Sequence, residues 1–168
     1  MSATVALSDP RVAAVPESEC HEPLVDLSTV PALQVDPGRA ASDGVPVQVR
    51  SGVVDRLVTA QSLLPRGLRL LVLVGYPPAG APSTAALRPT CICVPRVHLS
   101  GAAIDVAMYE EDPYRPREAV RDPRLSDVLL AAGLVNAPTH WWHWSYGDQY
   151  WALVTNATHA RYGAVPTG

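Results

Sequence analysis

Two short segments of the sequence hold side chains that could bind a metal ion together. The first places His98 and Asp105 on either side of a turn at Gly101, and the second contains His140 and His143. A turn folds the first residue back toward the second, so an imidazole and a carboxylate can point at one place. Two imidazoles and a carboxylate make a three-ligand site with a position left for water or substrate, as in catalytic zinc sites and the Fe(II) facial triad.

The second segment constrains how its two histidines can cooperate. Residues three apart on a regular strand point to opposite faces, so His140 and His143 converge only if the strand bends, bulges or ends between them. An alternative interpretation treats all these histidines as ordinary half-buried polar residues beside an aromatic core. The spacing alone leaves both interpretations open.

The two segments resemble the metal motifs of VanX-type D-alanyl-D-alanine dipeptidases, whose metallopeptidase fold is shared with hedgehog signalling domains. Residues 98–105 (HLSGAAID) are similar to the family's His-x-x-Gly-x-Ala-x-Asp motif, and residues 140–148 (HWWHWSYGD) to its Glu-Trp-Trp-His segment. Two weaker similarities precede them in the same order, at Val25–Ser28 and Leu73–Pro78. The resemblance implies that His98, Asp105 and His143 are metal ligands, with Zn²⁺ as the expected cofactor and Fe²⁺ as the alternative.

The chain departs from this family at positions that would carry catalysis. His140 stands where the family has its general base, a glutamate, and Pro77 stands where the family has an arginine that steadies the developing oxyanion. Arg96 replaces a serine that usually lies two residues before the first histidine. A general base contributes about 10²–10⁴-fold in rate and one oxyanion donor about 10²–10³-fold, so the loss of both predicts a poor peptidase.

Other residues could compensate for these losses. The imidazole of His140, neutral beside a dication, is a suitable general base and equally a suitable fourth ligand. The guanidinium of Arg88, Arg96 or Arg115 is a candidate to replace the missing oxyanion donor. Asp148 is expected either to orient a ligand imidazole or to lie in a turn. The residues expected to contact a small-molecule substrate are Arg96, Tyr76, Trp142 and Tyr146.

These features predict a metal-dependent enzyme that acts on a small amino-acid-derived substrate, on a dipeptidase-like scaffold repurposed away from efficient peptide hydrolysis. The repurposed reaction could be that of a lyase, cyclase, isomerase or Fe(II) oxygenase. One alternative is a zinc dipeptidase or amidohydrolase with His140 as its general base. Another is a non-catalytic metal-holding module, which is favoured if His140 closes the coordination sphere.

Composition and charge argue against several other classes of function. The chain has 168 residues, enough for one domain with a core, and its formal net charge of −3 gives no basic footprint for nucleic acid or an acidic membrane surface. The three cysteines form an odd set, and the sequence has no secretion-like leader or apolar run of about 18 residues. We therefore expect a cytoplasmic protein whose partner is a small molecule, and the sequence does not indicate an oligomeric state.

The pattern around these residues predicts the elements that position them. Residues 1–22 are expected to form a loose N-terminal arm, and residues 23–168 a single metallopeptidase-like domain. Helices are predicted over 52–64, with Ser51 as N-cap, and from Asp122 to Gly133. Strands are predicted at Leu68–Val74 and at about 90–94, 102–108, 139–145 and 149–154, with short extended pieces before residue 49 and a loop over 77–89. This order predicts an α+β fold, a small antiparallel sheet with helices packed on one side and the metal site on the sheet.

Overall fold

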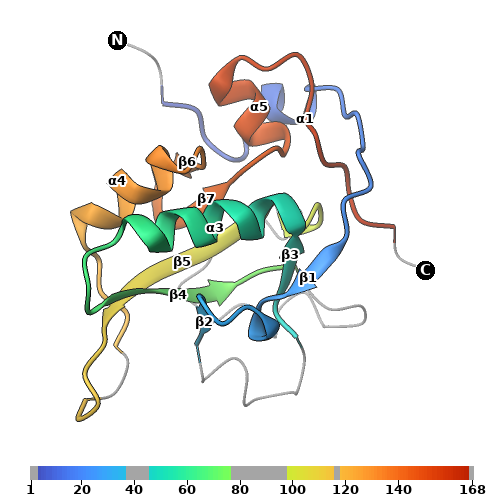
Figure 1. Cartoon of the computed structure of the whole chain (residues 1–168). Helices are drawn as coiled ribbons and strands as arrows, with labels where there is room; N and C mark the ends of the chain where they lie inside the picture. The colour runs from blue at the N-terminus through green and yellow to red at the C-terminus, as the bar shows by residue number, and fades with distance from the viewer. Residues whose placement is uncertain (1–3, 37–45, 77–97, 116–117, 167–168) are drawn as a thin grey trace.

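The protein has an α+β fold built around a five-stranded sheet, as the sequence predicts (Figure 1). The computed structural model describes residues 4–36, 46–76, 98–115 and 118–166. The strand order is β2-β4-β5-β7-β6, where the strands are β2 (Gln34–Val35), β4 (Leu68–Val74), β5 (Ala103–Glu110), β7 (His140–Ser145) and β6 (Val135–Ala137). All neighbouring strands in this sheet are antiparallel except β2 and β4, which pair in parallel at one edge. A separate two-stranded sheet joins β1 (Leu24–Asp26) to β3 (Gln48–Arg50), and the 3₁₀ turn η1 (Leu27–Thr29) follows β1.

Two helices pack together over one face of the five-stranded sheet and form the main core with it. They are α3 (Ser51–Leu63) and α4 (Pro123–Ala131), and both cross the sheet in Figure 1. The central strand β5 sends alternate side chains toward them, so Ile104, Val106 and Met108 belong to this core. The helices and the strands at 68–74, 102–108 and 139–145 confirm the sequence predictions, within a residue or two at their ends.

The N-terminus of α3 is capped differently from the prediction. Ser51 is the first helical residue and Arg50 occupies the N-cap position, where its side chain makes no capping hydrogen bond. The carboxylate of Glu22 instead accepts hydrogen bonds from the Gly52 amide at 2.9 Å and the Ser51 hydroxyl at 3.2 Å. Glu22, which lies 29 residues before Ser51, therefore caps the start of α3 in place of a neighbouring residue. Helix α4 has its predicted N-cap, because the Asp122 side chain accepts from the Arg124 amide.

The prediction of a strand over 149–154 is wrong. This segment forms the helix α5 (Gln149–Thr155), with the Asp148 side chain accepting from the Trp151 amide at its start and Asn156 in a left-handed conformation at its end. The partner of β7 at the sheet edge is the short strand β6 instead. The strand expected at about 90–94 and the loop expected over 77–89 lie outside the described residues.

The segment expected as a loose arm lies against the rest of the molecule from residue 4 onward. It contains the short helix α1 (Pro10–Ala13), which contacts α5. Val12 of α1 and Tyr150 of α5 share a second apolar cluster with the edge strand β6. Further along, the Ser18 amide donates to the Ala160 carbonyl at 2.8 Å. Among the described helices, none is long and apolar enough to cross a membrane.

Candidate metal centre

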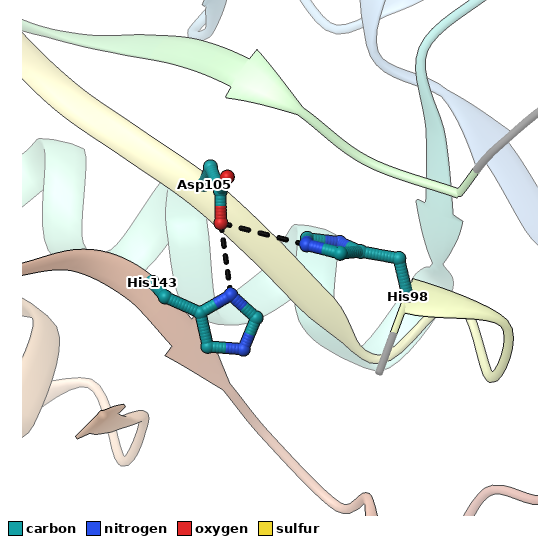
Figure 2. Close-up of side chains that lie close together, drawn as sticks. All are labelled: His98, Asp105 and His143. Atoms are coloured by element: carbon teal, nitrogen blue, oxygen red, sulfur yellow. Dashed lines mark hydrogen bonds and ion pairs between the residues drawn. The ribbon is translucent and has the colours of Figure 1, made fainter. Parts of the chain in front are cut away.

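The structure brings His98, Asp105 and His143 together on the face of the sheet opposite α3 and α4 (Figure 2). Asp105 on β5 and His143 on β7 are register partners on adjacent antiparallel strands, so their side chains stand directly beside each other. Asp105 alternates with Ile104 and Val106, which point to the helices. His98 comes from the turn that precedes β5 and reaches the same carboxylate from the other side.

The three side chains form a tight and fully enclosed group. One potential ligand atom from each lies within 4.8 Å of the others. The Asp105 Oδ1 atom is 2.9 Å from His143 Nδ1 and 3.5 Å from His98 Nε2. The two imidazole rings meet edge to face, with centroids 5.0 Å apart. The exposed fractions are 2% for His98, 1% for Asp105 and 0% for His143. A carboxylate and two imidazoles buried this deeply need a partner charge or a functional reason.

A backbone carbonyl fixes the tautomer of His98. Its Nδ1 lies 3.1 Å from the Ala103 carbonyl oxygen, which can only accept, so Nδ1 carries the proton and donates it. In the neutral ring the Nε2 lone pair then faces an oxygen of Asp105, and two acceptors stand against each other at 3.5 Å. The second carboxylate oxygen, Asp105 Oδ2, is buried and accepts no hydrogen bond from the described residues. This donor set fits a cation.

The electrostatics of the cluster favour the protonation states of metal ligands. Burial raises the pKa of Asp105, but its interactions with the His143 and His98 side chains, the hydrogen bond from His143 first among them, outweigh that effect and hold this pKa below its ordinary value. Burial lowers the pKa of His143, with a smaller opposing effect from its bond to Asp105. The carboxylate is therefore ionised and the His143 imidazole neutral near pH 7, which is the state in which both can ligate a metal.

The turn that carries His98 depends on a glycine. Gly101 has a φ of +69°, in the left-handed region that side chains disfavour. A Cβ added there would lie 2.5 Å from Leu24 Cδ2, too close without a shift. The Gly101 amide donates to the His98 carbonyl at 3.1 Å and closes the turn. The geometry anticipated from the sequence, with a turn aiming His98 back toward Asp105, is the geometry found.

A bulge in β7 separates the two histidines of the second segment. The pairing with β6 shifts between Asn136 and Ala137, and the Asn136 side-chain amide donates to the carbonyls of His140 at 3.1 Å and His143 at 2.9 Å. The side-chain amide thus donates to backbone carbonyls of β7 that the irregular strand pairing leaves without a backbone donor from β6. His143 joins the cluster, whereas His140 is not one of its members.

His140 and the other predicted site residues take different positions. The His140 Nδ1 atom is 2.8 Å from the Thr139 hydroxyl, and its ring packs edge-on to Trp142 with centroids 5.4 Å apart. Tyr146 lies in the core on the helix side, where its hydroxyl accepts from Arg56 at 3.0 Å, so the structure does not bring it to the cluster.

Tyr76 and Arg115, the arginine candidate that lies among the described residues, are not members of the cluster either. The Tyr76 amide pairs with the Gln48 carbonyl at 2.8 Å, beyond the end of β4. Arg115 is largely exposed and forms an ion pair with Asp112 at 3.6 Å. The positions of Pro77, Arg88 and Arg96 lie outside the described residues.

Three functional contacts were not anticipated from the sequence. They are the Ala103 carbonyl that fixes His98, the Asn136 amide that holds the bulge, and the contacts of Arg50 with the turn at residues 99–101. Asn136 is a weak sequence signal for the second contact, since asparagine side chains often bind nearby backbone groups. Nothing in the local sequence signals the other two.

Comparison of the chain with protein-family models, with curated proteins and with solved structures gave no match.

Proposed function

We propose that the protein binds a divalent metal ion through His98, Asp105 and His143, with Zn²⁺ as the first candidate and Fe²⁺ as the second. The observation that carries the proposal is the pair of buried acceptors, His98 Nε2 and Asp105 Oδ1, which face each other at 3.5 Å. A dication between such groups removes their mutual repulsion, and two imidazoles with one carboxylate suit zinc or non-haem iron. Bound there, a dication would supply Lewis acidity, polarising a substrate carbonyl and making water more acidic.

We further propose that the centre acts on a small amino-acid-derived molecule. The resemblance of residues 98–105 and 140–148 to a dipeptidase motif supports this substrate class. Asp105 is the single carboxylate of the described cluster, and His140 stands at the position where the dipeptidase motif has its general-base glutamate. This favours a reaction other than efficient peptide hydrolysis. A zinc dipeptidase with His140 as base remains the second candidate, because His140 lies on the same bulged strand as His143.

Metal binding is tested on the full-length protein after chelation. Isothermal titration with Zn²⁺ and visible absorption with Co²⁺ are compared between the natural protein and His98→Ala, with His159→Ala as the control for an exposed histidine outside the cluster. We expect one tight site per chain that His98→Ala weakens and His159→Ala leaves unchanged. A protein that binds neither ion, or binds equally well without His98, would contradict the proposal.

The reaction is tested with a panel of D- and L-dipeptides on the zinc-loaded protein. His140→Glu is run beside the natural protein, with His140→Gln as a control of similar size that has no carboxylate. We expect the natural protein to be nearly inert and His140→Glu to gain activity, since a glutamate supplies a general base worth about 10²–10⁴-fold. Efficient cleavage by the natural protein, lost in His140→Gln, would favour the dipeptidase candidate instead.

A further inference from the structure

The turn that carries His98 is held from outside by two segments far away in the sequence. Arg50 provides two of the contacts, since its amide donates to the Gly101 carbonyl and its Nε to the Ser100 carbonyl, each at 2.8 Å. The Val165 amide donates to the Leu99 carbonyl at 2.9 Å. Each of the three backbone carbonyls that follow His98 in the turn is therefore occupied by a donor from another part of the chain.

The guanidinium of Arg50 is itself fixed on all sides. Its two terminal nitrogens donate to the two carboxylate oxygens of Glu19, each at 3.1 Å, and one of them also reaches the Glu22 carbonyl at 2.7 Å. The other lies 3.3 Å from the Gly163 carbonyl, and the group sits over the Tyr162 ring at 5.4 Å from its centroid. Arg50 is 5% exposed. A planar fork held in this way has essentially one orientation.

We propose that Arg50 is a positioning residue for the candidate metal centre, with Glu19 as the group that orients it. Arg50 fixes the carbonyls of Ser100 and Gly101, the Gly101 amide binds the His98 carbonyl, and His98 is thereby placed against Asp105. On the other side of the turn, the Ala103 carbonyl sets the rotation of the ring. The inference rests on the proposed metal-binding function, because positioning has a consequence only where His98 is a ligand.

A lysine at this position separates charge from geometry. Lysine keeps the positive charge beside Glu19, but its single ammonium lacks the planar fork that binds Glu19 and the Ser100 carbonyl at the same time. Arg50→Lys should therefore leave the turn less well held in a folded protein. Contacts that orient a ligand without touching the metal typically change metal affinity by about 10- to 100-fold when removed.

The test is a Co²⁺ titration followed by visible absorption, on the natural protein, Arg50→Lys and Glu19→Gln. Leu129→Ala is the matched control, because Leu129 is fully buried on α4, on the helix side of the sheet, and its loss lowers Tm without touching the turn. We expect Arg50→Lys to weaken Co²⁺ binding by about 10- to 100-fold and to alter the absorption bands. Glu19→Gln should act in the same direction with a smaller effect, and Leu129→Ala should bind Co²⁺ as the natural protein does.

Equal Co²⁺ affinity and equal absorption bands in the natural protein, Arg50→Lys and Glu19→Gln would overturn the inference. So would a loss of affinity in Leu129→Ala as large as that in Arg50→Lys, since affinity would then follow global stability alone. If Arg50→Lys does not fold, Glu19→Gln decides between these results.

A second readout on the metal-free protein separates this inference from the proposed function. If the natural protein binds no Co²⁺, the proposed function fails, and the ¹⁵N and ¹H signals of the His98 ring then test the positioning. A shift of these signals in Arg50→Lys and Glu19→Gln, absent in Leu129→Ala, supports a role of Arg50 in placing His98. Unchanged His98 signals in both variants overturn it.

Discussion

Two groups of charged side chains in the described parts of the protein differ in how completely their hydrogen-bonding atoms are satisfied. The first is the metal cluster of His98, Asp105 and His143. The second, here called the terminal network, consists of Glu19, Glu22, Arg50, Arg161 and Tyr162. In the terminal network, Glu22 alone accepts from Tyr162 at 2.7 Å, Arg161 at 2.8 Å, Gly52 at 2.9 Å and Ser51 at 3.2 Å.

The metal cluster has the opposite arrangement. Among the described residues, Asp105 forms its ion-pair contacts with two imidazoles and none with an arginine, and its Oδ2 receives no donor. A polar cluster that only stabilises a fold tends to fill every acceptor, because an acceptor left empty in the interior costs free energy. Among the described residues, the hydrogen-bonding groups of the terminal network are therefore filled, whereas the candidate metal cluster keeps a carboxylate oxygen that no described donor reaches.

Asp105→Asn should have the largest effect on metal binding, because it changes the carboxylate at the centre of the cluster. The amide keeps the shape but removes the anionic ligand, so we expect Zn²⁺ affinity to fall by more than the roughly 100-fold typical of losing a group that only orients a ligand. Titration calorimetry measures the affinity, and circular dichroism checks the fold. Asp122→Asn, at the N-cap of α4 and outside the cluster, is the control and should bind Zn²⁺ as the natural protein does. Unchanged affinity in Asp105→Asn would mean that the metal is held elsewhere.

Asp148 provides a third case, because it is a buried carboxylate at the start of α5 that accepts a hydrogen bond from the Trp151 amide and lies close enough to His98 for their charges to interact. Burial raises its pKa from 3.8 to about 6. The pKa of Asp148 is higher in the folded protein than in the unfolded chain. The stabilisation of the folded state by protonated Asp148 is therefore complete below about pH 4 and is lost as the pH rises through 6. Asn is an equally good N-cap and does not titrate.

We therefore expect the metal-free natural protein to lose stability relative to Asp148→Asn between about pH 4 and 7, by up to about 3 kcal/mol. Urea unfolding at several pH values measures this difference. A difference that stays constant across this range would show that Asp148 titrates near its ordinary value.

Glu22→Gln should have the smallest of the three effects, and it tests the terminal network. Losing the charge in a network of four donors is expected to lower the free energy of unfolding by about 2 kcal/mol, while Zn²⁺ affinity stays the same. Because the pKa of Glu22 is held below its ordinary 4.5, the difference should be full above that pH and fade in more acidic solution. Asp9→Asn, which loses an ion pair to the exposed side chain of Arg11 at the surface, is the control and should unfold as the natural protein does. A large loss of metal affinity in Glu22→Gln would contradict the separation of the two clusters.

The elements that sequence could predict are those whose signals are local. Local sequence is enough to predict the strand at Leu68–Val74, from its apolar run, and the start of α4, from Asp122 and Pro123. Both elements are found at those residues. The α5 segment was misjudged because its aromatic and β-branched side chains favour strands, although Asp148 was available as an N-cap signal. The cap of α3 could not be predicted, since Glu22 acts from 29 residues away.

The candidate site divides in the same way. His98, Gly101 and Asp105 lie within one short motif, so their meeting could be anticipated from a single turn. The register that places His143 beside Asp105 joins residues 38 positions apart and depends on the bulge held by Asn136. No local sequence pattern predicts this pairing of strands, and none predicts the contacts of Arg50 with the turn. Both depend on tertiary packing.

The contact between Arg50 and the Gly163 carbonyl spans 113 residues and has a consequence for the order of folding. Contacts between residues so far apart in the chain form slowly, because a long loop must close before they bring any stabilisation. During synthesis, the strands that carry Asp105 and His143 are complete well before residues 163–165 have emerged to join the turn of His98. The candidate metal centre is therefore expected to be among the last parts of the molecule to reach its final geometry, and on the proposed function a newly made chain should bind a metal tightly only after its main core has formed.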